Sequence, residues 1–135
     1  MDFYSNAATD NFRIARSKFM EAPEDGTYGV IRMPNKAFLV DVWFNLLAPF
    51  NTGSTAEITI GIRGNKLPDN PDGVMDSALI DATAAGWYRA SSGTSATSEG
   101  YWFNEASGDI TITISRGDAT NNMYGVVLAQ YSVLF

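Results

Sequence analysis

The chain has 135 residues, of which 45% are hydrophobic, 13% aromatic and only 18% charged, and its formal net charge is −6. A chain of this length is expected to form one domain that buries roughly two-thirds of its unfolded surface. The 9 basic residues are scattered, so the clustered cations that a phosphate backbone or an anionic membrane requires are missing. We therefore predict no nucleic-acid partner and no membrane partner.

The sequence contains neither cysteine nor histidine. Disulfides, thiolate metal sites and the Ser-His-Asp and Cys-His catalytic arrangements are thereby excluded. A carboxylate pair could still act on a glycosidic bond, but no two acidic residues are marked as flanking a cleft. We predict no enzymatic activity, no cofactor and no metal site. No apolar run approaches the length of a membrane span, and the amino terminus lacks the order of a signal peptide, so we expect no export by that route.

Residues 1–26 are the least regular part of the chain, and we predict an amino-terminal arm or edge segment there. Within it, Asn11–Phe19 alternates loosely and could form a short edge strand that carries Arg13, Arg16 and Lys18. Two interpretations stay open. The segment is either an ordinary solvated part of its own subunit or an extended arm that reaches a neighbouring subunit.

The stretch Ile31–Arg63 predicts two long strands joined by a turn-rich loop at Ala48–Thr55. Because strand side chains alternate between faces, each strand should direct one set of side chains into a core. We predict that the core face of the first strand consists of Phe38, Val40, Val42, Phe44 and Leu46. The core face of the second strand should consist of Ile58, Ile60 and Ile62. The opposite face of the first strand mixes apolar and polar groups and includes Leu39, Trp43 and Leu47.

The segments on either side of these strands give further predictions. Thr27–Met33 reads as a strand that ends in a Pro34-Asn35 turn. Gly64–Gly73 is rich in Pro, Gly, Asn and Asp, so we predict a connection without regular structure. A short helix is predicted across Val74–Ala84, because its apolar residues have rough helical spacing and a glycine follows its end.

The second half of the chain predicts four more strands, at residues 87–90, 101–103, 109–115 and 123–135, with a low-complexity polar tract at 91–100. The last strand is apolar on both faces, as in strands that are buried on both sides or packed on a partner. The total is about seven or eight strands and at most one short helix. We predict an all-β fold, a single antiparallel β-sandwich over residues 27–135, either jelly-roll-like or immunoglobulin-like.

Two sets of apolar side chains are candidates for binding a partner. The first set suits a contact with another subunit or a shell and consists of Leu39, Trp43, Leu47, Tyr131 and Phe135. The alternative is that a second sheet layer or the helix covers them. The second set suits the stacking of sugar rings and consists of Trp87 and Trp102. The alternative for these tryptophans is a place in the core or in a subunit contact.

Four stretches resemble small structural proteins of tailed-bacteriophage virions: Met33–Val42, Ala56–Ile62, Asp81–Tyr88 and Gly108–Ile114. The proteins in question are β-sandwich capsid decoration (cement) subunits and related head-fibre or tail modules. The resemblance covers about residues 28–132 and lies in patterns of the fold, without a catalytic motif. No functional residue is carried over, because that family works through surfaces.

The resemblance implies a non-enzymatic virion structural protein, made in the host cytoplasm and placed on the capsid surface. It implies that the partners are the major capsid protein or other virion proteins. It also implies a homo-oligomer, with a trimer favoured, because such subunits bind at symmetry axes of a shell. Two other functions stay open, namely a carbohydrate-binding fibre or adhesion module and a structural component of the neck or tail.

Overall fold

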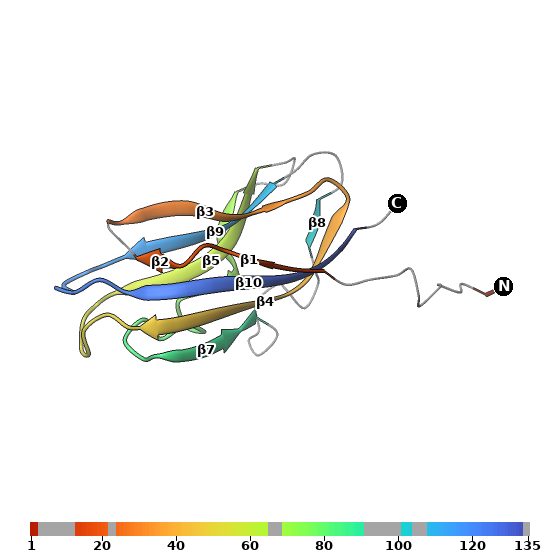
Figure 1. The fold of residues 1–135 in the computed structure, drawn as a ribbon. Coiled ribbons are helices and arrows are strands. Elements are labelled where there is room, and N and C mark those ends of the chain that lie inside the picture. The colour runs from red at the N-terminus through yellow and green to blue at the C-terminus, as the bar shows by residue number, and fades with distance from the viewer. Residues whose placement is uncertain (3–12, 22–23, 65–68, 91–100, 104–107, 134–135) are drawn as a thin grey trace.

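The computed structural model of the chain describes residues 1–2, 13–21, 24–64, 69–90, 101–103 and 108–133, with only the backbone for 101–103. These residues form ten strands in two antiparallel sheets, and they include no α-helix (Figure 1). Figure 1 shows the sheets as two layers, one with β3, β9 and β5 and the other with β1, β10, β4 and β7. The predicted antiparallel β-sandwich is confirmed.

The first sheet has six strands, four of which follow the order β1-β10-β4-β7. In addition, β2 pairs with β10 and β8 pairs with β4. The bounds of these strands are β1 Arg13–Arg16, β2 Met20–Glu21, β4 Ala37–Ala48, β7 Gly86–Arg89, β8 Tyr101–Phe103 and β10 Tyr124–Val133. The second sheet has four strands in the order β3-β9-β5-β6. Its bounds are β3 Gly26–Met33, β5 Glu57–Gly64, β6 Asn70–Met75 and β9 Gly108–Ser115.

The core lies between the two sheets. Ile58, Ile60 and Ile62 of β5 and the matching isoleucines of β9 are at most 3% exposed, as the alternation predicts. They face Val42 and Phe44 of β4, which are fully buried. Burying a large aliphatic side chain contributes about 1.5–3 kcal/mol, so this layer supplies most of the stability of the fold.

A β-bulge in β4 makes one part of the core prediction wrong. Gln130 of β10 pairs with Asp41 and the next residue, Tyr131, pairs with Leu39, so Val40 has no partner. An extra residue of this kind reverses which side chains face inward. Before the bulge Ala37 and Leu39 are therefore buried in the core, where Phe38 and Val40 were expected. After it, Val42, Phe44 and Leu46 are buried, as predicted.

The segment after β5 also differs from the prediction. Asn70–Met75 is a strand, and the residues that follow it up to Ala84 form turns, so the helix was wrong, and so was the unstructured connection at 70–73, while 65–68 lie outside the described residues. The backbone N–H groups of Ala78 and Leu79 donate to the Asp76 carboxylate, each at 3.0 Å, which holds a turn. Pro71 is tolerated because β6 is an edge strand. The polar tract 91–100 lies outside the described residues.

The first two strands pair within the chain. β1 pairs with β10 over Arg13–Arg16, and the backbone N–H of Ser17 donates to the Val127 carbonyl at 2.8 Å. The Ser17 hydroxyl accepts from the Val127 N–H at 2.9 Å, which extends the attachment beyond the strand. Within the segment 1–26, the strands β1 and β2 are thus part of the six-stranded sheet. The boundary at residue 26 stays a prediction.

Two isoleucines offer a matched test of this core. Ile112 is fully buried and Ile14 is 69% exposed. Ile112→Ala should lower the free energy of unfolding by about 2–5 kcal/mol, because it removes buried methyl groups and leaves a cavity. Ile14→Ala should change it by less than about 0.5 kcal/mol. Urea denaturation followed by tryptophan fluorescence measures both, and equal losses would contradict the arrangement of the sheets.

Candidate interaction surface

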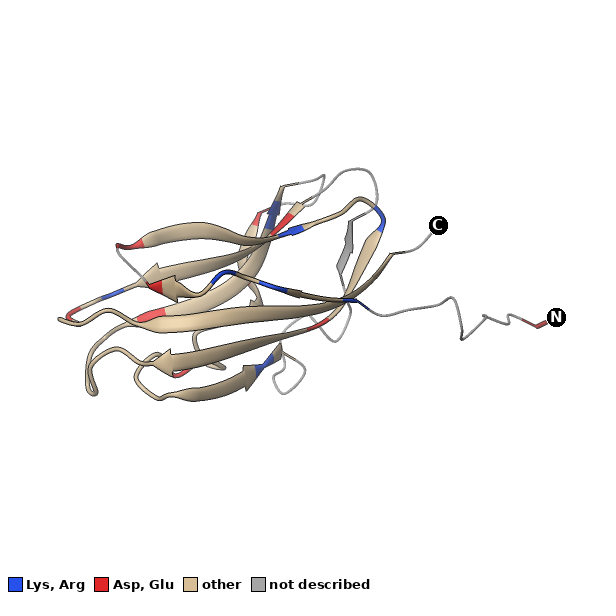
Figure 2. Cartoon of the chain, viewed as in Figure 1, with Lys and Arg blue, Asp and Glu red and all other residues tan. Residues whose placement is uncertain are grey.

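The outer face of the six-stranded sheet carries a row of four residues aligned across four strands. The register pairs Arg16 with Leu128, Leu128 with Trp43, and Trp43 with Arg89. Residues that are directly opposite one another on adjacent strands point to the same face. The row therefore places a leucine and a tryptophan between two arginines. In Figure 2, β10 is free of charged residues, and the outer strands β1 and β7 of the path β1-β10-β4-β7 carry basic residues.

The rows on either side extend the apolar surface. One contains Ile14 and the other Trp87, which is 61% exposed. Together with Leu128 and Trp43 they line a shallow groove of about 360 Å³, which we call the apolar groove. Exposed tryptophan and isoleucine side chains that gather on one flat sheet face are unusual for a surface that meets only water.

Asp41 anchors one side of this face. Its side chain is only 4% exposed, and its carboxylate accepts from Arg89 Nε at 2.6 Å. The Arg89 guanidinium also lies over the ring of Trp43, 5.3 Å from the ring centroid. A cation over an indole ring is attracted to its π face. Arg89 thus ties a buried carboxylate on β4 to the tryptophan at the centre of the row.

Tyr88 holds the strand that carries Trp87 and Arg89. Its ring packs against Phe44, with centroids 6.5 Å apart. Its hydroxyl lies 2.6 Å from the Ala84 carbonyl and 2.9 Å from the Asp81 carbonyl and can donate to either. Burial raises the pKa of Tyr88 above its ordinary value of 10.0, and the charge of Asp81 raises it further. The turn before β7 is therefore fixed to the strand.

A second bulge in β4 exposes Leu47. Tyr124 pairs with Ala48 and Gly125 pairs with Leu46, so Leu47 has no partner on β10 and is 48% exposed. It lies at the opposite end of β4 from the Val40 bulge and extends the apolar character of the outer face. The outer face thus carries exposed apolar side chains on β1, β4 and β7.

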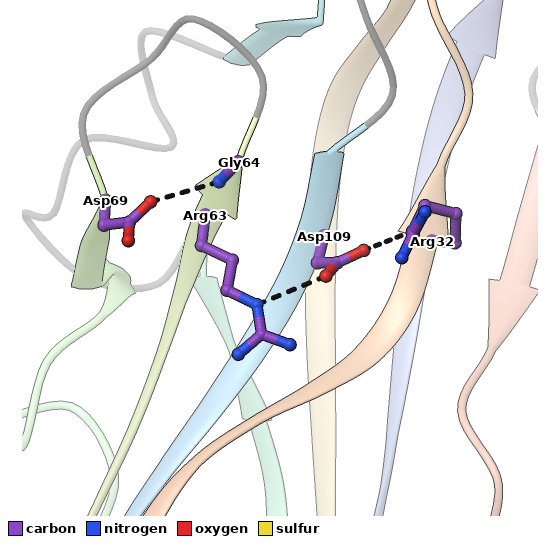
Figure 3. Close-up of polar contacts among 5 residues, drawn as sticks. All are labelled: Arg32, Arg63, Gly64, Asp69 and Asp109. Atoms are coloured by element: carbon purple, nitrogen blue, oxygen red, sulfur yellow. Dashed lines mark hydrogen bonds and ion pairs between the residues drawn. The ribbon is translucent and has the colours of Figure 1, made fainter.

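The outer face of the four-stranded sheet has the opposite character. There the register aligns Arg32, Asp109 and Arg63, and both arginines donate to the carboxylate of Asp109 between them (Figure 3). The Asp69 carboxylate accepts from the Gly64 backbone N–H at 3.1 Å beside them. On this sheet the central position of the row is a carboxylate that both arginines share, whereas the corresponding row of the other sheet has a leucine and a tryptophan there.

The structure places the predicted contact residues in different environments. Trp43 and Leu47 lie on the outer face, as proposed from the alternation. Leu39 is 1% exposed in the core, so its assignment to a contact face is wrong, and the bulge at Val40 is the reason. Tyr131 is half-buried and packs against the core. Phe135 lies outside the described residues.

The two predicted sugar-stacking tryptophans pair with β4 at distant positions. Trp87 pairs with Asn45 and Trp102 with Phe38. At about 3.3 Å per strand residue, these positions are roughly 20 Å apart. A single sugar ring cannot stack on both, so a glycan site that uses both would have to take an extended chain.

Sequence reasoning missed Arg16, Leu128 and Arg89 as parts of this surface. Alternation within β1 and β10 indicates which residues share a face, but the register between strands decides which ones meet. Among the described residues, no group of three or more acidic side chains is placed to hold a metal ion. None of the described segments forms a helix long and apolar enough to cross a bilayer.

Removing Arg89 should destabilise the fold and disturb Trp43. Arg89→Ala takes away the guanidinium that pairs with the buried Asp41 carboxylate, which should cost about 1.5–3 kcal/mol in free energy of unfolding. It should also change the fluorescence of the native state. Arg63→Ala is the control and should cost less than about 1 kcal/mol, because Asp109 keeps Arg32. Denaturant titrations compare the two, and a larger loss for Arg63→Ala would count against this account.

The raised pKa of Tyr88 predicts a loss of stability in alkali. Above pH 10 the unfolded chain loses the tyrosine proton before the folded chain does, so the unfolded state binds fewer protons and stability falls as pH rises. Below that pH the contribution is fully present. Tyr88→Phe should flatten this part of the profile of unfolding free energy against pH. Parallel profiles for the two proteins above pH 10 would show that Tyr88 makes no such contribution.

The comparisons with known proteins identify the fold. No protein-family model matches the chain, and no curated protein matches its sequence. A chain of the cyanophage Pam1 capsid asymmetric unit superimposes with a TM-score of 0.67 at 11% identity, over 99% of this chain and 93% of that one. A chain of the capsid of Ralstonia phage GP4 gives 0.63 at 12% identity, over 99% and 92%.

A chain of the acidic stable capsid of Helicobacter pylori bacteriophage KHP30 gives a TM-score of 0.61 at 16% identity, over 90% of this chain and 86% of that one. At such low identities the likeness concerns the fold alone. Because it spans nearly the whole of both chains each time, the matching chains are themselves of about this size. The protein shares its sandwich with small chains of three phage capsid structures.

Proposed function

We infer that the protein is a non-enzymatic structural component of a phage virion, and specifically a capsid decoration subunit that binds the outside of the head and stabilises it. The observation that carries this proposal is the match, over nearly the full length of each chain, to chains from three phage capsids. A sandwich of this size that forms a separate chain in a capsid stays attached because its outer surface binds other proteins of the capsid.

The outer face of the six-stranded sheet supports the proposal. It offers the shallow apolar groove lined by Ile14, Trp43, Trp87 and Leu128. The central row of this face has an arginine on each of its two outer strands. Tryptophan and arginine are the residues that most often dominate the energy of protein interfaces. Residues that bind in this way need no catalytic group, which agrees with a chain that has neither histidine nor cysteine.

A decoration subunit stabilises a shell by mass action. A protein that binds the assembled state and not the dissociated one raises its stability in proportion to the logarithm of its concentration over the dissociation constant. A contact at each symmetry-related position of the shell makes the effect cumulative. An arrangement of several copies around an axis, with a trimer as the favoured case, fits this use but depends on the shell.

The proposal predicts saturable binding to heads that lack this protein. Purified chain added to heads of a parent phage from which its gene has been deleted should bind at a fixed number of copies per head. Binding should raise the temperature at which the heads release their DNA, because assembled shells are selectively stabilised. Sedimentation with the heads measures the stoichiometry, and cryo-electron microscopy of the decorated particle locates the subunit. Density confined to the neck or tail would assign the chain there instead.

A carbohydrate-binding fibre module is the second candidate, because Trp87 is 61% exposed on a flat face that a sugar ring could cover. In that case a glycan array should reveal a ligand, and Trp87→Ala or Trp102→Ala should abolish its binding without a change in oligomeric state. A decoration protein should give no glycan signal. The two functions are separated by whether heads or glycans bind the wild-type chain.

A further inference from the structure

The central row of the six-stranded sheet restricts what can cover this face. Arg16 and Arg89 stand at its two ends, three strand spacings apart. At about 4.8 Å per spacing, they lie roughly 14 Å from one another. The apolar side chains of Leu128 and Trp43 lie between them. A surface that covers the row must therefore be apolar at its centre and compatible with cations at both ends.

The positive charge of this row is not neutralised within the row. Arg16 is exposed, and no described carboxylate pairs with it. The Asp41 carboxylate beside the row is buried and bound to Arg89, so it cannot serve a partner as well. Arg89 is therefore neutralised, and the charge that has no carboxylate beside it among the described residues is that of Arg16. On the four-stranded sheet, by contrast, Asp109 satisfies both of its arginines.

A second copy of the chain does not suit this face in a two-fold contact. In such a contact the same patch lies on both subunits, so the row of one subunit brings no carboxylate to the Arg16 of the other. Like charges brought together at an interface are unfavourable. The sheet face is also small. Ten residues of β10 and four strands give it an area of roughly 600 Å², below the about 800 Å² per partner of a standard interface.

We propose that the outer face of the six-stranded sheet docks on a different protein, whose surface presents apolar side chains beside a carboxylate that lies opposite Arg16. The apolar part of the partner fills the groove at Trp43 and Trp87, and its carboxylate pairs with Arg16, while Arg89 stays bound to Asp41. The proposal rests on the proposed function, because the partner is then the shell protein of the head. The modest area of the face means that other segments or many copies complete the attachment.

Charge reversal at Arg16 tests this assignment, because Arg16 is exposed and has no partner among the described residues whose loss would unfold the chain. In sedimentation with heads that lack the protein, Arg16→Glu should weaken binding at least about tenfold at low salt and less at high salt. Arg16→Lys should keep most of the affinity. Lys36→Glu makes the same charge change at an exposed turn away from the face and should bind as wild type does.

Truncation at Trp87 tests the apolar part. Trp87→Ala should weaken binding about tenfold at low and high salt alike, because it removes apolar contact and no charge. The circular dichroism spectrum should stay unchanged, since this side chain is largely exposed. Analytical ultracentrifugation of each free variant reports whether the change acts on self-association instead.

The outcomes separate the two proposals. If the wild-type chain binds heads and both Arg16→Glu and Trp87→Ala bind equally well, the docking face is wrongly assigned while the decoration function stands. If these variants alter the oligomeric state of the free chain and not its binding to heads, a second copy covers the face and the proposal is overturned. If the wild-type chain binds no head at all, both the function and the docking partner are wrong.

Discussion

The β-bulge at Val40 is the constraint on which the rest of the molecule depends. It lets β4 bury Ala37 and Leu39 at its beginning and Val42, Phe44 and Leu46 at its end, while β10 continues alongside. Without the extra residue, one half of the strand would direct its large apolar side chains to solvent. The bulge also brings Asp41 and Trp43 to the outer side, where Arg89 on the neighbouring strand reaches both of them.

The two outer faces differ in the residues that lie between the arginines of a cross-strand row. Each face has a cross-strand row with arginines at its ends. On the four-stranded sheet the residue between them is Asp109, and both arginines form ion pairs with its carboxylate. On the six-stranded sheet the residues between them are Leu128 and Trp43, so Arg89 pairs with Asp41 of the next row and Arg16 has no carboxylate partner among the described residues. The first face suits water, and the second suits another protein.

Much of the fold followed from the sequence because alternation is strong in the isoleucine-rich strands β5 and β9. Isoleucine occupies every second position in the middle of both strands, so the face assignment needed no tertiary information. The bulges in β4 leave no such signal, because the residues around Val40 are apolar on both sides. β6 was missed for a related reason. Its proline and glycine read as a turn, although an edge strand with a bulge accepts both.

The surface itself could be predicted only in part. Trp43, Leu47 and Trp87 were singled out from their own strands, but their neighbours Ile14 and Leu128 come from strands more than a hundred residues apart in the sequence. The register of β1 on β10 brings them together, and the sequence of either strand alone does not determine this register.

The side chains of this face are held in place by contacts behind them. Tyr88 fixes β7 to the preceding turn, and Asp41 fixes Arg89 against Trp43. A binding face whose central side chains are already ordered loses little conformational entropy on docking, which allows a small area to contribute a useful affinity.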